Sequence, residues 1–147
     1  MTPSLKNALA YQYPLLVGAV PATGVDQTVI KTASFTIPPN SKFVWIHTLN
    51  GTIQSAAGAF SVRVQLYDSV HGALCNVPTE IENIAGDIYK TFLAAPRSIR
   101  PFPLPETYIF NAGATVTATY TVRLYPNGGN PSFASVGLIL CGYRIPI

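Results

Sequence analysis

The chain has 147 residues, of which 48% are hydrophobic, 11% aromatic and only 10% charged, and its net charge is +3. This length fits one domain, and the hydrophobic content excludes intrinsic disorder, which requires low hydrophobicity and high charge. The nine Lys and Arg residues are scattered, so no basic stripe indicates nucleic-acid binding by the isolated domain. So little surface charge protects weakly against association, which indicates a chain that meets other protein surfaces.

The first 25 residues are weakly patterned and are predicted to form either a first strand or an arm that lies over a neighbouring molecule. The apolar stretch around Leu15 resembles an export signal, but Gln12 and Pro14 interrupt it. The sequence contains no run of about 20 apolar residues, so it predicts no transmembrane helix. We therefore expect a single folded domain over residues 26–147.

Six further segments are predicted to be strands, because β-branched and aromatic residues recur in them, in several with period-two alternation. Thr115 to Leu124 alternates strictly, which places Tyr120 in the predicted core between Ala118 and Val122. Proline and glycine separate the segments and predict turns. The segments cover residues 29–37, 43–49, 60–67, 104–110, 115–124 and 133–145.

The last segment differs from the others because it is apolar on both faces. Val136, Leu138 and Leu140 lie on one face, and Ile139, Cys141 and Tyr143 lie on the other. This pattern predicts a strand that is central in its sheet or that is covered on its outer face by another subunit.

Residues 71–100 are predicted to form an irregular excursion between strands. Within it, Thr79 and Glu82 have capping-box spacing, and Ile81, Ile84 and Ile88 follow at helical intervals. These residues predict one short helix of at most two turns. Short strands at regular intervals without strand–helix–strand alternation predict an all-β fold, an antiparallel, jelly-roll-like β-sandwich.

The search for catalytic chemistry is largely negative. The sequence has no nucleophile elbow and no glycine-rich nucleotide-binding motif. His47 is predicted to lie on the same strand face as Trp45. It is interpreted either as a metal ligand that points into the fold or as an ordinary hydrogen-bonded histidine. His71 fits a solvated turn. Cys75 and Cys141 match no metal or redox spacing and are predicted to be buried thiols, or a disulfide in an oxidising compartment. We expect no enzymatic activity, no cofactor and no metal.

Aromatic residues leave a second class of function open. Exposed Tyr and Trp side chains form the platforms on which carbohydrate-binding modules stack sugar rings, although Tyr is also simply a favoured strand residue. A carbohydrate-binding β-sandwich is therefore the alternative to a structural protein. The side chains that could form such a platform are Tyr11, Tyr13, Trp45, Tyr67, Tyr89, Tyr108, Tyr125 and Tyr143.

Four segments carry a family resemblance: residues 35–45, with a proline corner between two strands, residues 60–69, residues 100–115 and the closing Gly142-Tyr-Arg-Ile145. In their order and motifs they resemble small β-sandwich virion proteins of tailed bacteriophages, in which a proline-rich "LP-x-P-x-x-F" segment precedes a Thr/Val strand. Glu106 stands where that motif has a further proline, and the similarity spans residues 30–147 at the level of pattern.

The resemblance implies a structural protein of the virion, assembled in the host cytoplasm: a capsid decoration (cement) protein, or a head–tail or tail component. Its implied partners are the major capsid protein or other virion proteins. A homo-oligomer, in the form of a trimer, is expected, with no membrane or nucleic-acid partner. We expect the interface to be formed by apolar and aromatic groups, namely Tyr11, Tyr13, Leu15, Leu16, Tyr67, Tyr89, Phe92, Leu93, Phe102, Tyr108 and Ile109.

Overall fold

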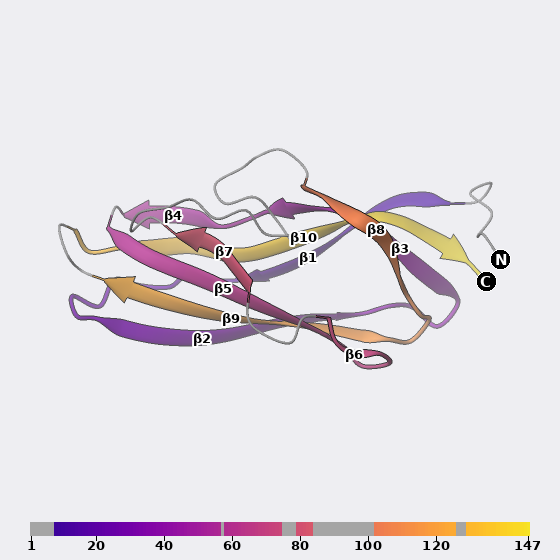
Figure 1. Cartoon of the computed structure of the whole chain (residues 1–147), viewed down its shortest axis with the longest axis horizontal. Helices are drawn as coiled ribbons and strands as arrows, with labels where there is room; N and C mark the ends of the chain where they lie inside the picture. The colour runs from indigo at the N-terminus through magenta and orange to yellow at the C-terminus, as the bar shows by residue number, and fades with distance from the viewer. Residues whose placement is uncertain (1–7, 57, 75–78, 84–101, 126–128) are drawn as a thin grey trace.

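Two antiparallel sheets pack face to face in the computed structural model (Figure 1). The structure describes residues 8–56, 58–74, 79–83, 102–125 and 129–147, with all of their side chains except those of residues 79–83, 102 and 105. Its strands are β1 (Leu9–Val17), β2 (Gln27–Thr36), β3 (Ser41–Asn50), β4 (Ile53–Ala56), β5 (Ala59–Asp68), β6 (Gly72–Ala73), β7 (Thr79–Asn83), β8 (Phe102–Phe110), β9 (Thr115–Tyr125) and β10 (Ser132–Pro146).

The order of the strands is that of a jelly roll. The first sheet has the order β1-β10-β3-β8, with β4 also paired to β10, and the second has the order β2-β9-β5, with β6 and β7 both paired to β5. With the short β4 and β6 set aside, the remaining strands form the two four-stranded sheets of a double Greek key. This arrangement confirms the predicted all-β, jelly-roll-like sandwich.

The inward faces of the strands form one core between the two sheets. Burial alternates along β5 and β9, as the sequence pattern predicts, and Tyr120 is fully buried, as expected. Aromatic rings fill the centre, and Phe60 and Phe133 meet edge to face with ring centroids 4.7 Å apart. The largest fully buried side chains are Tyr120, Phe43, Phe60, Phe110, Phe133, Leu15, Ile37, Leu66, Leu124 and Leu138.

Tyr120 also links the two sheets through its hydroxyl group. The hydroxyl donates to the carbonyl of Leu15 on β1 and accepts from the N–H of Leu138 on β10 at 3.0 Å. Gly137 permits this approach, because a Cβ there would overlap the Leu15 carbonyl and lie 2.9 Å from the Tyr120 hydroxyl. Its φ of 148° also disfavours other residues. The buried polar group is thus satisfied by backbone groups of the opposite sheet.

The N-terminal segment is a strand within the described residues. β1 pairs with β10 from Leu9–Arg144 to Val17–Val136 without a register shift. Tyr13 and Leu15 point into the core, and Tyr13 stacks on Phe35 with ring centroids 4.2 Å apart. This part of the chain therefore belongs to the first sheet.

The predicted short helix is wrong at Thr79 to Asn83, which form the strand β7. β7 pairs with the edge of β5 between Ser61 and Val64. The spacing of Thr79 and Glu82 fits a helix start, but pairing with β5 satisfies the backbone N–H and C=O groups of the same residues. Ile84, Ile88 and most of the predicted excursion lie outside the described residues.

Candidate functional site

The outer face of the first sheet is the candidate functional surface, because uncharged residues run across the neighbouring strands β1, β10 and β3. β10 alternates between core residues and the outward Ile139, Cys141 and Tyr143. The strand registers extend each of these positions into a row. The rows are Pro14–Ile139–Leu49, Gln12–Cys141–His47 and Ala10–Tyr143–Val44, and the last continues to Ile109 on β8.

None of these outward positions carries a formal charge. Lys42 and Arg144 lie at one end of the sheet, where Lys42 pairs with Ile145 and Arg144 pairs with Phe43, and Glu106 lies on the edge strand β8. The Arg144 guanidinium also lies over the Tyr11 ring, 4.9 Å from its centroid. The centre of the face is therefore apolar or neutral, as in the core of a protein–protein interface.

A groove of about 490 Å³ crosses the middle of this face. Its position follows the central row of the register, where Cys141 pairs with both Gln12 and His47. It is wide enough to receive a side chain from a binding partner. The groove is lined by Ala10, Tyr11, Gln12, Ile46, His47, Cys141, Gly142 and Tyr143.

The groove has little potential for nucleophilic catalysis. Burial raises the pKa of the Cys141 thiol, which donates a weak hydrogen bond to the carbonyl of Ile139 at 3.7 Å. A thiol with a raised pKa stays protonated at neutral pH, whereas the nucleophile and metal ligand is the thiolate. Cys141 is a buried free thiol, as one of the two interpretations of the sequence expected, and Cys75 lies outside the described residues.

His47 does not lie on the same face as Trp45. The pairing of β3 with β8 shifts register between the two residues, so that Trp45 is buried in the core while His47 lines the outer groove. The indole N–H of Trp45 donates to the carbonyl of His47 at 3.0 Å and to the hydroxyl of Thr48 at 3.1 Å. Among the described residues, no group of three His, Cys, Asp or Glu side chains could hold a metal ion.

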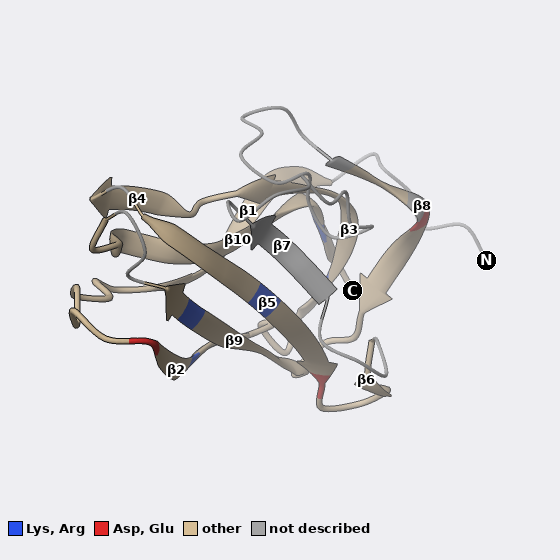
Figure 2. Cartoon of the chain, turned by 60° about the vertical axis from the view of Figure 1, so that its left-hand side comes forward, with Lys and Arg blue, Asp and Glu red and all other residues tan. Residues whose placement is uncertain are grey.

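The outer face of the second sheet has a different chemistry. The outward positions of β9 are Thr115, Thr117, Thr119 and Thr121, and Arg123 follows them. On β2 their register partners are Thr36, Ser34, Thr32 and Ile30, and on β5 the partners of Thr117, Thr119 and Thr121 are Tyr67, Gln65 and Arg63. Lys and Arg colour segments of β5 and β9 in Figure 2. This face carries mainly hydroxyl groups, together with a few cations and the exposed side chains of Ile30 and Tyr67.

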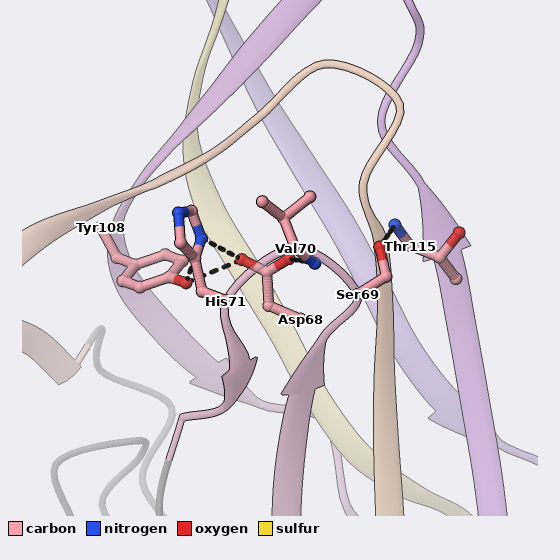
Figure 3. Close-up of polar contacts among 6 residues, drawn as sticks. All are labelled: Asp68, Ser69, Val70, His71, Tyr108 and Thr115. Carbon is pink, nitrogen blue, oxygen red and sulfur yellow. Dashed lines mark hydrogen bonds and ion pairs between the residues drawn. The ribbon is translucent and has the colours of Figure 1, made fainter.

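A polar cluster joins the two sheets at the end of β5 (Figure 3). Asp68 is fully buried, and its carboxylate accepts hydrogen bonds from the Val70 N–H at 2.9 Å and from the Tyr108 hydroxyl of β8 at 2.7 Å. The His71 Nδ1 lies 2.9 Å from the same carboxylate oxygen that Tyr108 contacts. Beside it, the Thr115 N–H donates to the Ser69 hydroxyl at 2.8 Å.

The electrostatics of this cluster keep Asp68 ionised. Burial raises the pKa of Asp68, but the hydrogen bonds from Val70, Tyr108 and His71 outweigh it and bring the pKa below its usual value. Burial, together with the neighbouring carboxylate, raises the pKa of Tyr108 above its ordinary value. Both groups therefore hold their charge states firmly at neutral pH.

The cluster is a structural link and not a catalytic triad. In a triad the histidine must reach the serine hydroxyl, whereas the hydroxyl of Ser69 accepts from the backbone of Thr115 and the His71 Nδ1 lies against Asp68 and Tyr108. The turn predicted at His71 agrees with the Asp68–Val70 hydrogen bond. No local pattern pointed to the partner of Asp68, Tyr108, which is 40 residues away.

The predicted interface residues fall into several environments. Tyr11, Leu16 and Tyr67 are exposed, Tyr108 and Ile109 are half-buried, and Tyr13 and Leu15 are core residues that have little or no exposed surface. Phe102 lies in β8, but its side chain is not among those described, and three predicted residues lie outside the described part of the chain, namely Tyr89, Phe92 and Leu93.

The outer groups of β10 were recognised in the sequence only as a second apolar face and were not among the predicted interface residues. Ile139, Cys141 and Tyr143 form the middle of each outer row. The continuous apolar character of the segment was the signal that could have identified them.

Comparisons with known proteins add a distant likeness. No family model matches the chain, and no curated protein matches its sequence. The matching solved structures include those of infectious bursal disease virus, strain Gx (8% identity, TM-score 0.38) and strain Gt (9%, 0.39), and the VP2 subviral particle of the same virus (9%, 0.39). The matches cover 96% of this chain and 32% to 34% of the viral chains, so this chain spans about a third of their length. The matched chains are viral capsid proteins. No helix in the described residues is long and apolar enough to span a bilayer.

Proposed function

We propose that this chain is a non-enzymatic structural protein of a bacteriophage particle, a capsid decoration protein that binds neighbouring virion proteins through the outer face of its first sheet. The observation that carries the proposal is the set of uncharged rows centred on Ile139, Cys141 and Tyr143. An isolated sandwich normally places polar residues on its outer faces. Apolar groups there stabilise a complex when a partner removes them from water.

The groove supplies the shape that such an interface needs. Binding energy at protein interfaces is concentrated in a few side chains that enter well-packed pockets, surrounded by contacts that exclude water. A groove of about 490 Å³ whose lining includes Gln12, Cys141 and Tyr143 can receive one such side chain. The jelly-roll topology fits this role, although viral capsid proteins, lectins and cupins share it, and the sequence resemblance to phage virion proteins favours the first of these.

The proposal is tested by binding to phage particles that lack this protein, with aspartate introduced on either outer face. In Ile139→Asp the new carboxylate would be buried in the interface without a partner, so binding should weaken roughly 30-fold, which corresponds to about 2 kcal/mol. The matched control is Thr119→Asp, which introduces the same charge on the outer face of the second sheet. It should bind like the unmodified chain.

Circular dichroism and thermal unfolding must show that both variants are folded. Equal binding of the two variants would contradict the proposed surface. Chemical cross-linking within complete particles would then identify the neighbours and separate a capsid position from a head–tail or tail position. Sedimentation at increasing concentration tests the proposed homo-oligomer, and a monomer at every concentration, alone and with particles, would contradict it.

A further inference from the structure

A shallow depression lies on the outer face of the second sheet, opposite the surface assigned above to the virion. Its volume is about 340 Å³, and it is lined by Gln65 and Tyr67 of β5, Ala73 of β6, and Thr117 and Thr119 of β9. These five side chains come from three neighbouring strands in register. The depression is thus part of the sheet surface and not a gap between loops.

The ring of Tyr67 is the most prominent group in the depression. Tyr67 is 51% exposed, and its register partners are Thr117 on one side and Ala73 on the other. Both partners are short side chains, so neither covers the ring. None of the ring contacts among the described residues involves Tyr67, whereas Tyr11, Tyr13 and Tyr108 all pack against other rings.

The groups around this ring are neutral and can form hydrogen bonds. Thr117 and Thr119 present hydroxyl groups, and the next strand continues the pattern with Ser34 and Thr32 in register. No lining residue carries a formal charge, and the row that contains Arg63 lies beyond the lining residues. An anionic ligand would be expected to find a cation in its site, and an apolar partner would leave these hydroxyl groups buried without hydrogen bonds.

A neutral sugar ring matches both features. Its C–H face packs on an aromatic ring, and its hydroxyl groups exchange hydrogen bonds with hydroxyl and amide side chains. We propose that the depression beside Tyr67 is a binding subsite for a neutral pyranose ring of a glycan, stacked on Tyr67 and oriented by Thr117 and Thr119. The site lies on the opposite sheet from the virion-binding surface, so glycan and virion partner can be bound together.

The proposal is tested by titrating isotope-labelled protein with three neutral oligosaccharides, maltopentaose, cellopentaose and chitotetraose. A shallow site with one stacking ring is expected to bind in the millimolar range. At least one sugar should shift the backbone amide resonances of Gln65, Ala73, Thr117 and Thr119 in a saturable manner. If none of the three shifts these resonances at tens of millimolar, the proposal is overturned.

Two substitutions of the same residue separate stacking from simple apolar contact. Tyr67→Phe keeps the ring and should bind within about threefold of the unmodified chain, whereas Tyr67→Leu keeps an apolar side chain without a ring and should weaken binding roughly tenfold or more. Equal binding by all three proteins would overturn stacking on Tyr67. The control is Tyr11→Leu on the first sheet, which should leave the affinity unchanged; weakening by this variant instead would place the sugar at the other face.

Discussion

The outer faces of the two sheets differ although their central strands occupy equivalent places. β9 lies between β2 and β5, and β10 lies between β1 and β3. The outward side chains in the middle of β9 are threonines, whereas those of β10 are Ile139, Cys141 and Tyr143. Both strands bury their other face in the same core. The difference is therefore not required by folding, and under the proposed function the neutral rows on β10 form the face that a neighbouring protein covers.

Some residues hold the two sheets together, whereas others are not needed for folding and are available for binding. Tyr120 and the Asp68–Tyr108 hydrogen bond connect the two sheets from within. The outward rows contribute little to that connection. Substitutions at the inner links should therefore reduce stability, and substitutions in the outward rows should change binding.

The largest effect is expected at Gly137, where the Tyr120 hydroxyl reaches the backbone of the opposite sheet. In Gly137→Ala the new methyl group would overlap the Leu15 carbonyl and displace the Tyr120 hydroxyl. The free energy of unfolding should fall by about 4 kcal/mol, measured by urea denaturation. Gly18→Ala is the control, because no atom lies within 4 Å of a Cβ there. If the two variants had similar stability, the role assigned to Gly137 in the contact between Tyr120 and the opposite sheet would be wrong.

A smaller and pH-dependent effect is expected at the buried carboxylate. Asp68→Asn weakens the hydrogen bonds from Tyr108 and His71 and should cost about 2 kcal/mol at pH 7. Because folding lowers the pKa of Asp68, its contribution is complete above the ordinary value of about 3.9 and is lost as the pH falls through the folded value.

The difference in unfolding free energy between the parent chain and Asp68→Asn should therefore shrink as the pH falls below about 4. Asp26→Asn is the control, since Asp26 is 59% exposed and lies 3.6 Å from Arg123. It should change stability by less than about 1 kcal/mol. A difference at Asp68 that stays constant over this pH range would show that the charge is not what stabilises the link.

The smallest expected effect concerns the edge of the hydroxyl-bearing sheet. β2 pairs with β9 over ten residues without a register shift, and the inward position of Lys31, opposite Tyr120, places a charge on this edge. Inward charges on edge strands prevent pairing between molecules. Lys31→Val should therefore increase self-association in sedimentation velocity without loss of stability. Lys42→Val is the control because β3 is flanked by β10 and β8; equal behaviour of the two variants would refute this role.

Most of the strands could be predicted because their patterns are local. The alternation of Thr115 to Leu124 predicted β9. The two-sided apolar character of residues 133–145 predicted a strand that is central or covered on its outer face by another subunit, and the structure confirms that β10 is central. The prediction of a short helix was wrong at β7, because local residue spacing does not encode the pairing of β7 with β5. Burial of Tyr13 and Leu15 followed from the pairing of β1 with β10, which the weak N-terminal pattern left open.

The candidate surfaces were predictable only in part. The outward residues of β10 follow from period two, but the groove requires β1 and β3 on either side of that strand, a tertiary arrangement. The link between Asp68 and Tyr108 and the side-by-side placement of Tyr67 with Thr117 and Ala73 depend on the same long-range pairing. His47 was placed on the wrong face because a register shift next to Trp45 interrupts the alternation.

The most direct test of the virion-binding surface is hydroxyl-radical footprinting of the free protein and of the assembled particle. Two tyrosines report on the two faces, Tyr143 on the first sheet and Tyr67 on the second. We predict that assembly protects Tyr143 and leaves the reactivity of Tyr67 nearly unchanged. Protection of Tyr67 together with an unprotected Tyr143 would contradict the account.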